Sequence, residues 1–219
     1  MPIRLDQRLT TIANLVDYGT VADVGCDHGK LGYYLVSTDR ASRVIATDIS
    51  APSLAKACEL AKENGVSELM QTRLGDGLNP VESNEADTVI IAGLGGDVIA
   101  GIIQGAREQS KQFEHYILSP NTHAERVRQE VVKCEHTIVY DEIMECASKT
   151  YTIIKTQKGK SELSEKQIRF GAFYTTSESF LQFANKELES LNNILKANPK
   201  AVELKGKIQE LESAIAEHK

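Results

Sequence analysis

The sequence predicts an α/β fold, in which a doubly wound parallel sheet is followed by an antiparallel hairpin of two helices. Short apolar runs alternate with helical segments up to about residue 134, and this order is typical of βαβ units and a parallel sheet. After a polar break at 158–161, the β-branched runs give way to two stretches whose apolar residues alternate spacings of three and four. The 219 residues suffice for one substantial core and a smaller appendage.

The first part of the chain is expected to cover 1–158. It opens with apolar residues at helical spacing, which predict an amphipathic helix that ends at Gly19. Strands are predicted at 21–25, 42–48, 68–74, 87–92 and 115–119, with helices at 29–37, 51–64, after Gly96 to about 107, and at 123–134. The runs at 136–146 and 150–157 predict an antiparallel hairpin, because only three residues separate them.

The second part, 159–219, is expected to be helical. A Ser-x-x-Gln pattern at 164–167 predicts a capped short helix that Gly171 ends. A Thr-x-x-Glu pattern at 175–178 is expected to open a longer helix, and Asn-Pro at 198–199 to begin the last one. Each long helix should have about 20 residues, and their heptad stripes predict an antiparallel coiled coil.

The composition indicates a soluble globular protein, with 41% hydrophobic and 26% charged residues. No apolar run approaches the roughly 20 residues that span a bilayer, and the N-terminal stretch lacks the apolar core of a secretion signal. The four cysteines form no C-x-x-C pair, which favours reduced thiols in the cytoplasm. The five histidines form no H-x-x-x-H pair, so no metal site is expected.

The net charge of −6 means that a nucleic-acid partner would have to be held by a local basic patch. Basic residues do cluster around the junction of the two parts. They are Lys149, Lys155, Lys158, Lys160, Lys166 and Arg169. This cluster is either a stripe that binds phosphates or a solvated linker.

A glycine turn, Asp23-Val-Gly-Cys-Asp-His-Gly29, follows the first predicted strand and precedes a helix. Such a turn holds nucleotide-type ligands against backbone N–H groups. The dinucleotide pattern G-x-G-x-x-G fails here, because Asp27 and Lys30 stand at two of its glycine positions. A P-loop fails as well. The turn is similar to the D/E-x-G-x-G-x-G pattern of class I S-adenosylmethionine (SAM) methyltransferases, with Asp27 in place of the middle glycine.

The ends of the first four predicted strands carry Gly25, Asp48, Asp76 and Gly93, and ligands of open α/β sheets lie beyond these ends. Asp48 is placed to accept hydrogen bonds from ribose hydroxyls. Asp76 could accept from an adenine amino group, with Gly77 letting the base approach the backbone. Alternatively, Asp48 and Asp76 only cap turns. His28 could likewise only cap or pack at the helix start, and Cys26 is more simply a small wall residue than a nucleophile.

The turn, together with Ile91-Ala-Gly-Leu-Gly-Gly96 and Leu118-Ser-Pro-Asn121, resembles the bacterial tRNA (adenine-22-N1)-methyltransferases, the TrmK family. The resemblance runs over the whole chain, from Arg8-Leu9 to the helical hairpin. Methionine is usual in the family where Leu94 stands, and glutamine where Ser119 stands. It implies a Rossmann-like class I methyltransferase domain that transfers the SAM methyl group to N1 of an adenine in the tRNA D-arm.

The resemblance also suggests the roles of individual residues. We expect Asp27 and His28 to face both SAM and the target base, and Asn121 to hydrogen-bond the base. Arg8 would bind the SAM carboxylate or a phosphate. The residues expected to bind SAM are Arg8, Asp23, Gly25, Cys26, Asp27, His28, Gly29, Asp48, Ile49, Asp76, Gly77, Ala92 and Gly93. N1 of adenine carries an in-plane lone pair, so its methylation needs positioning more than a base.

Two other functions remain open from the sequence. The protein could be a SAM-dependent methyltransferase of a protein or a small molecule, which suits its acidic charge. It could also be a non-catalytic SAM-binding scaffold whose helical hairpin recruits a partner. The hairpin could grip tRNA, dimerise or brace the first domain. A monomer is expected, and a homodimer through the hairpin is left open.

Overall fold

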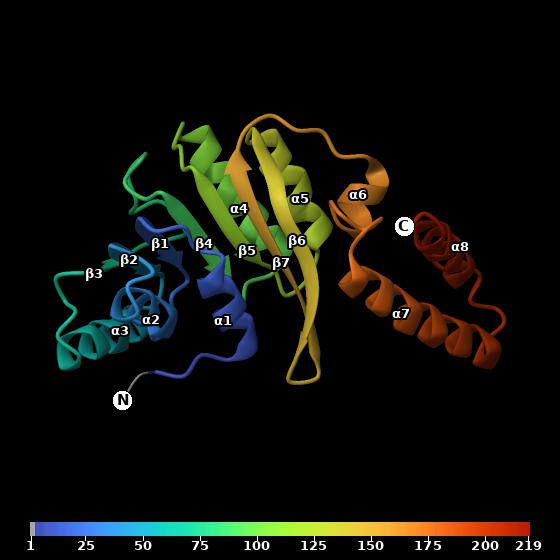
Figure 1. The fold of residues 1–219 in the computed structure, drawn as a ribbon, viewed down its shortest axis with the longest axis horizontal. Helices are drawn as coiled ribbons and strands as arrows, with labels where there is room; N and C mark the ends of the chain where they lie inside the picture. The colour runs from blue at the N-terminus through green and yellow to red at the C-terminus, as the bar shows by residue number, and fades with distance from the viewer. Residues whose placement is uncertain (1–2) are drawn as a thin grey trace.

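A computed structural model describes residues 3–219. Met1 and Pro2, the start of the stretch that lacks a signal-like apolar core, lie outside the described residues. The chain forms a seven-stranded sheet with helices on both faces and further helices after the last strand (Figure 1). The strands are β1 (Thr20–Val24), β2 (Arg43–Asp48), β3 (Met70–Leu74), β4 (Thr88–Ala92), β5 (His115–Ser119), β6 (His136–Cys146) and β7 (Lys149–Lys158). The helices are α1 (Gln7–Asn14), α2 (Lys30–Ser37), α3 (Ala51–Glu63), α4 (Gly96–Glu108), α5 (Ala124–Lys133), α6 (Glu165–Phe170), α7 (Glu178–Ala197) and α8 (Val202–Ala216).

The strand order is β3-β2-β1-β4-β5-β7-β6. The first five strands are parallel, and Val21 of β1 lies opposite Val44 of β2 on one side and Thr88 of β4 on the other. β7 runs antiparallel to both β5 and β6. These pairings confirm the predicted doubly wound sheet and its terminal hairpin. Because the order reverses between β1 and β4, a ligand site is expected at the carboxyl ends of these two strands.

Apolar side chains fill both faces of the sheet. Ile12 of α1 and Leu35 of α2 pack with Ile90 on one face, together with α3. Ile99 of α4 packs with Ile91 on the other face, which α5 also covers. Ile90 and Ile91 are neighbours in β4 that point to opposite faces, and both are fully buried. This double burial explains why the strands are continuous apolar runs in the sequence.

The structure corrects two predicted helix starts. Ser177, not Thr175, is the N-cap of α7, and its hydroxyl accepts from the N–H of Phe180 at 3.1 Å. Asn198 does not begin α8 but ends α7, and α8 starts at Val202. Consequently α7 has the expected 20 residues but α8 only 15. The capping box at Ser164 is confirmed.

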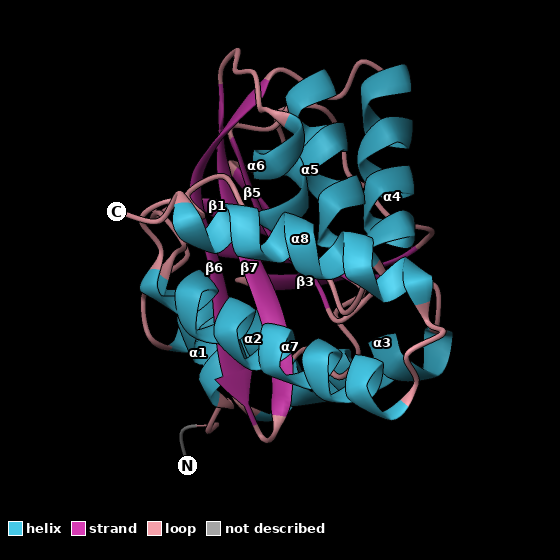
Figure 2. Cartoon of the chain, turned by 90° about the vertical axis from the view of Figure 1, so that its right-hand side faces the viewer, coloured by secondary structure: helices cyan, strands magenta, loops and turns pink. Residues whose placement is uncertain are grey.

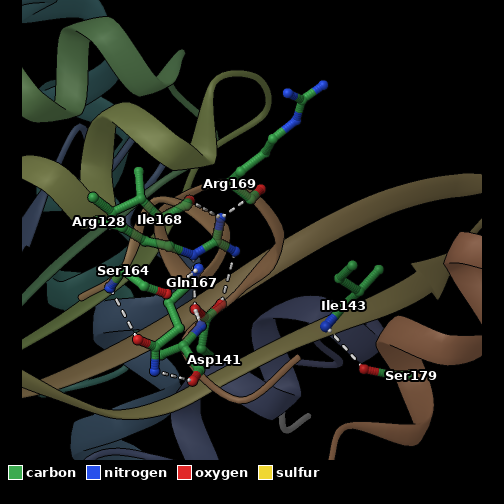
Figure 3. Close-up of polar contacts among 9 residues, drawn as sticks. Arg128, Asp141, Ile143, Ser164, Gln167, Ile168, Arg169 and Ser179 are labelled. Carbon is green, nitrogen blue, oxygen red and sulfur yellow. Dashed lines mark hydrogen bonds and ion pairs between the residues drawn. The ribbon is translucent and has the colours of Figure 1, made fainter. Parts of the chain in front are cut away.

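A buried ion pair connects the sheet to the C-terminal helices (Figure 3). Arg128 of α5 donates from Nε and Nη2 to the carboxylate of Asp141 on β6, at 2.7 and 3.0 Å. The same guanidinium donates to the carbonyl of Ile168 in α6, and Asp141 accepts from the N–H of Ala172. The two side chains are only 3% and 1% exposed, so every hydrogen bond here replaces one to water.

Helices α7 and α8 lie side by side across the face of the molecule seen in Figure 2. Their shared apolar cluster includes Phe180, Ala184, Leu211 and Ala214. The first residues of α7 therefore pack against the last residues of α8, as expected of an antiparallel pair. The knobs-into-holes packing of a coiled coil stays a prediction. Within residues 3–219, no helix is both long and apolar enough to cross a bilayer.

Candidate functional site

The glycine turn between β1 and α2 is held in a left-handed backbone conformation. Gly25, Asp27 and Gly29 have φ values of 71°, 51° and 70°. The N–H groups of Gly25 and Cys26 donate to the carbonyl of Thr47 on β2, at 2.8 and 3.0 Å. Glycine adopts such angles without strain, and aspartate tolerates them better than most residues do. The turn therefore presents the N-terminal end of α2, with its free N–H groups, at the carboxyl edge of the sheet.

Asp23 is buried below this turn, with 5% of its surface exposed. Its Oδ2 has no hydrogen-bond partner among the described residues. Burial is the main reason why the pKa of the Asp23 carboxyl rises to about 7; the N–H of Gly32 opposes the rise and the carboxylate of Asp48 adds to it. An unpartnered carboxylate oxygen at a ligand-binding edge is suited to accept a hydrogen bond from a cationic or N–H donor.

Asp48 and Ile49 end β2 beside the turn. The Oδ2 of Asp48 accepts from the N–H of Asp27 at 3.0 Å, and its Oδ1 accepts from the N–H of Ser50 at 2.8 Å. Asp48 thus does brace two turns, but each of its oxygens keeps a second lone pair for a ligand hydroxyl. Ile49 is 73% exposed, which gives the site an apolar side chain that is open to a ligand.

Asp76 and Gly77 follow β3 and border a hollow of about 350 Å³. Val98 and Ile102 of α4 line its other side. Gly77 has a φ of 56°, and a side chain at this position would come within 3.0 Å of Ile102. Asp76 is exposed and forms no side-chain hydrogen bond with any described residue, so its carboxylate is free for a ligand.

Arg8 of α1 reaches the end of β4. A Cβ atom on Gly93 would lie 3.7 Å from Arg8 Nη1, and the guanidinium carbon lies 4.7 Å from the ring centre of Tyr151 on β7. Arg8 Nη1 is buried and has no partner among the described residues. A buried guanidinium nitrogen without an acceptor strongly favours an anionic ligand. The sequence gives no sign of Tyr151, because the hairpin brings it to the site from far along the chain.

Asn121 lies at the end of β5, next to the same loop. Its Nδ2 donates to the carbonyl of Gly93 at 2.6 Å, and its N–H donates to the carbonyl of Leu94 at 2.8 Å. Asn121 is therefore fixed against the loop after β4, with its Oδ1 left as a free acceptor. Ser119, the last residue of β5, is fully buried.

Asp27 and His28 lie together at the mouth of the site. His28 Nε2 is 3.4 Å from Asp27 Oδ1 and 3.1 Å from Nζ of Lys56 on α3. Since the lysine can only donate, His28 accepts at Nε2 and carries its hydrogen on Nδ1. The Asp27 side chain is 76% exposed. Lys56 is a further polar group here that the sequence does not reveal, because its partner is 28 residues away.

Cys26 and Ala92 form apolar parts of the wall. Cys26 is buried, and this burial, followed by the nearby carboxylates of Asp23 and Asp48, raises the pKa of its thiol far above the usual range. A thiol that stays protonated is no nucleophile, in agreement with the role of a wall residue. Ala92 is half-buried at the end of β4.

The basic cluster of the domain junction is dispersed in the structure. Lys166 and Arg169 pair with the carboxylates of Glu217 and Glu210 at α8. Lys155 pairs with the carboxylate of Asp17, which follows α1, at 2.6 Å, and the Lys155 side chain is 15% exposed. These three side chains already have carboxylate partners, and Lys149 and Lys158 lie at opposite ends of β7, so a phosphate-binding stripe stays a prediction. Across residues 3–219, no group of three or more His, Cys, Asp or Glu side chains is arranged to hold a metal ion.

Known proteins that are similar to this chain are methyltransferases. Residues 5–154 match the family model described as a methyltransferase domain. The tRNA (adenine(22)-N(1))-methyltransferase of Bacillus subtilis is 32% identical over 171 residues, which cover 78% of this chain and 72% of that protein.

Two solved structures superpose on nearly the whole chain. A Streptococcus pneumoniae protein in complex with S-adenosyl-L-methionine superposes with a TM-score of 0.86 at 30% identity, over 97% of this chain and 100% of that one. M. capricolum TrmK, in complex with S-adenosyl-homocysteine, superposes with a TM-score of 0.85 at 27% identity, over 98% and 99% of the two chains. The chain therefore belongs to the family of the bacterial tRNA (adenine(22)-N(1))-methyltransferases.

Proposed function

We propose that this protein transfers the methyl group of SAM to N1 of adenine 22 in the D-arm of tRNA. The observation that carries the proposal is the buried Arg8 Nη1, which has no partner among the described residues and faces Gly93 at the carboxyl edge of the sheet. The guanidinium of Arg8 can form a charged hydrogen bond with an anion, and the carboxylate of SAM would be that anion. The family membership of the chain supports the choice of tRNA.

The residues around the glycine turn fit SAM part by part. Arg8 would hold the carboxylate of the amino acid moiety and Asp23 its ammonium group. Asp48 would accept from the ribose hydroxyls, as its oxygens each have a free lone pair. The exposed Ile49 would cover one face of the adenine, whose amino group would donate to Asp76. When bound, SAM supplies an electrophilic methyl group on a sulfonium ion.

The target adenine would enter at the mouth formed by Asp27, His28 and Asn121. Since N1 carries a free lone pair at neutral pH, the protein needs to align this atom and exclude water rather than remove a proton. Asn121 Oδ1 is a free acceptor, and it would fix the base through its exocyclic amino group. The methylated base is cationic, and the exposed carboxylate of Asp27 would stabilise the developing charge.

The wider predictions are part of the same proposal. The proposed domain boundary at residue 158 is supported by the end of β7 at Lys158. The protein would act as a monomer in the cytoplasm, where its substrate is. The C-terminal helices would contact tRNA, held in place by the buried pair of Arg128 and Asp141.

The direct test is incubation of the purified protein with labelled SAM and unmodified tRNA. We expect label in the tRNA and a reverse-transcription stop at adenine 22, with neither in a tRNA that carries guanine there. Label in other macromolecules or small molecules, but not in tRNA, would support the alternative of a different methyl acceptor. Binding of SAM without transfer to any acceptor would support a scaffold protein.

Two matched variants assign the reaction to the site. Asp27→Gly keeps the left-handed backbone but removes the carboxylate, and Asp39→Gly makes the same change at another exposed aspartate with a φ of 53°. We expect Asp27→Gly to lower the methylation rate at least tenfold, about the contribution of one charge-stabilising group. Asp39→Gly should leave it unchanged. Equal rates for the two variants would remove Asp27 from the mechanism.

A further inference from the structure

A second cavity, of about 340 Å³, opens at the other end of the parallel strands, away from the glycine turn. It lies between the last residues of α4 and α5 and the strand ends at His115, His136 and Lys158. We call it the Tyr116 cavity. Its main lining residues are Arg107, Phe113, Tyr116, Lys133, His136 and Lys158. Its volume falls within the range of roughly 300–1,000 Å³ that is usual for small-molecule sites.

Two buried side chains turn hydrogen-bond donors toward this cavity. Tyr116 is 3% exposed, and its Oη has no hydrogen-bond partner among the described residues. His136 is 4% exposed, and its Nδ1 lies 3.0 Å from Thr156 Oγ1. That oxygen accepts from the N–H of Tyr116 at 3.3 Å, and its hydroxyl hydrogen is available to His136 Nδ1. The neutral His136 ring then carries its own hydrogen on Nε2, which is left as a donor.

Burial lowers the pKa of His136 to about 4, and the positive charges of His115 and Lys158 add to this effect. His136 is thus uncharged at neutral pH and binds as a donor rather than as a cation. Burial also raises the pKa of the nearby Cys134 thiol to about 11, so this cysteine is unreactive. The cavity therefore has the features of a binding site, without a nucleophile or a general base.

The lining carries four cationic side chains, Arg107, Lys111, Lys133 and Lys158, and one carboxylate, Glu135, which pairs with Lys160 at 3.2 Å. Arg107 and Lys133 share the single buried carboxylate of Glu130, each at 3.2 Å. Among residues 3–219, the side chain of Lys158 donates only to the amide oxygen of Gln112, at 2.7 Å. In a protein with a net charge of −6, this local excess of positive charge selects for an anionic ligand.

Three aromatic rings form the floor of the cavity and show only a narrow part of their surface, since Phe113, Tyr116 and His136 are 2%, 3% and 4% exposed. The rings of Phe113 and Tyr116 meet edge to face at 6.0 Å, and those of Tyr116 and His136 at 4.8 Å. A chain of rings that ends in buried donors suits a planar ligand, because the ring packs on the floor while the anionic group reaches the donors.

We propose that the Tyr116 cavity binds a small ligand that combines a phosphate group with a planar ring, of the size of a nucleoside monophosphate. The phosphate accepts from Tyr116 Oη and His136 Nε2 and faces Lys158 and Lys133. The ring lies against Phe113. This site is separate from the methyl-transfer site and does not depend on the proposed reaction.

The test is calorimetric titration of the full chain with adenosine 5′-monophosphate, with S-adenosylhomocysteine present to occupy the cofactor site. We expect saturable binding that is weaker for inorganic phosphate and absent for adenosine. Tyr116→Phe and Lys158→Met should each weaken it at least tenfold, the usual effect of removing a hydrogen bond or ion pair to a charged group. The control is Lys205→Met, because Lys205 is exposed on α8 and does not line the cavity.

Other results would overturn the proposal. Adenosine binding as tightly as its monophosphate would show that the anionic group is not recognised. Equal affinity in Tyr116→Phe, Lys158→Met and Lys205→Met would show that the nucleotide binds elsewhere. Tyr116→Phe keeps the ring, and an unchanged thermal midpoint would show that it is folded. The nitrogen resonances of the His136 ring give a second readout, since they should shift on titration only if Nε2 meets the ligand.

Discussion

Replacement of Asp23 by asparagine is expected to stabilise the protein without ligand at alkaline pH. The carboxyl is 5% exposed, and its pKa is about 7 instead of the ordinary 3.8. This difference of about 3 pH units corresponds to roughly 4 kcal/mol, because each unit represents about 1.4 kcal/mol. Asparagine has nearly the same shape but no charge. Its amide must still be buried, so this figure is the upper bound of the gain.

The sign of the pH dependence follows from the same two pKa values. Between about pH 4 and pH 7 the folded protein keeps a proton on Asp23 that the unfolded chain has released. This contribution to stability is fully present below about pH 4 and is lost as the pH rises through about 7. The Asp23→Asn variant should therefore have about the same stability as the wild type near pH 4. At about pH 8 it should melt up to roughly 10 °C higher.

The assay is thermal unfolding of both proteins over this pH range, followed by circular dichroism. The difference between variant and wild type is the relevant quantity, since the titration of other groups, such as His136 and Glu85, cancels in it. Asp76→Asn serves as the control, because an exposed substitution should change stability by less than about 0.5 kcal/mol. A difference between Asp23→Asn and wild type that does not vary with pH would refute the reasoning.

Three further predictions concern other parts of the chain. Arg8→Gln should weaken S-adenosylhomocysteine binding at least tenfold by calorimetry and leave the thermal midpoint nearly unchanged, because Arg8 Nη1 has no hydrogen-bond partner within residues 3–219. Asn121→Ala should lower the methylation rate roughly tenfold or more with less than a threefold effect on that affinity, since its free oxygen faces the base site. Arg128→Ala should lower the free energy of unfolding in urea by about 3–5 kcal/mol by leaving Asp141 buried and unpaired, and Arg128→Met with Asp141→Leu should recover most of it.

The features predicted correctly from the sequence depend on neighbouring residues. Strands β1, β2, β4 and β5 are local apolar runs, and their alternation with helices predicts that they are parallel. The capping box at Ser164 joins residues only three positions apart. The left-handed turn at Gly25 and Gly29 likewise follows from glycine itself.

The features missed from the sequence depend on contacts between distant segments. Thr175 and Ser177 are both suitable N-caps, and the sequence cannot show that Ser177 also donates to Glu142 of β6, at 2.6 Å. Tyr151 joins the candidate site only because the β6–β7 hairpin carries it over Arg8. Lys166 is one of several basic residues in the sequence, but in the structure its charge is neutralised by Glu217. Such pairings require the tertiary fold.

Asp27 shows how a departure from a sequence pattern carries information that the pattern itself does not. Its φ of 51° is the conformation that the pattern's glycine would adopt without strain, whereas a side chain here costs on the order of 1 kcal/mol. The hydrogen bond from its N–H to Asp48 holds the backbone in place, so the strained residue does not relax to another conformation. This strained backbone conformation places the Asp27 carboxylate, which is 76% exposed, beside His28 at the mouth of the site. A glycine would complete the cradle for SAM, but only the aspartate adds a negative charge where a cationic adenine would form.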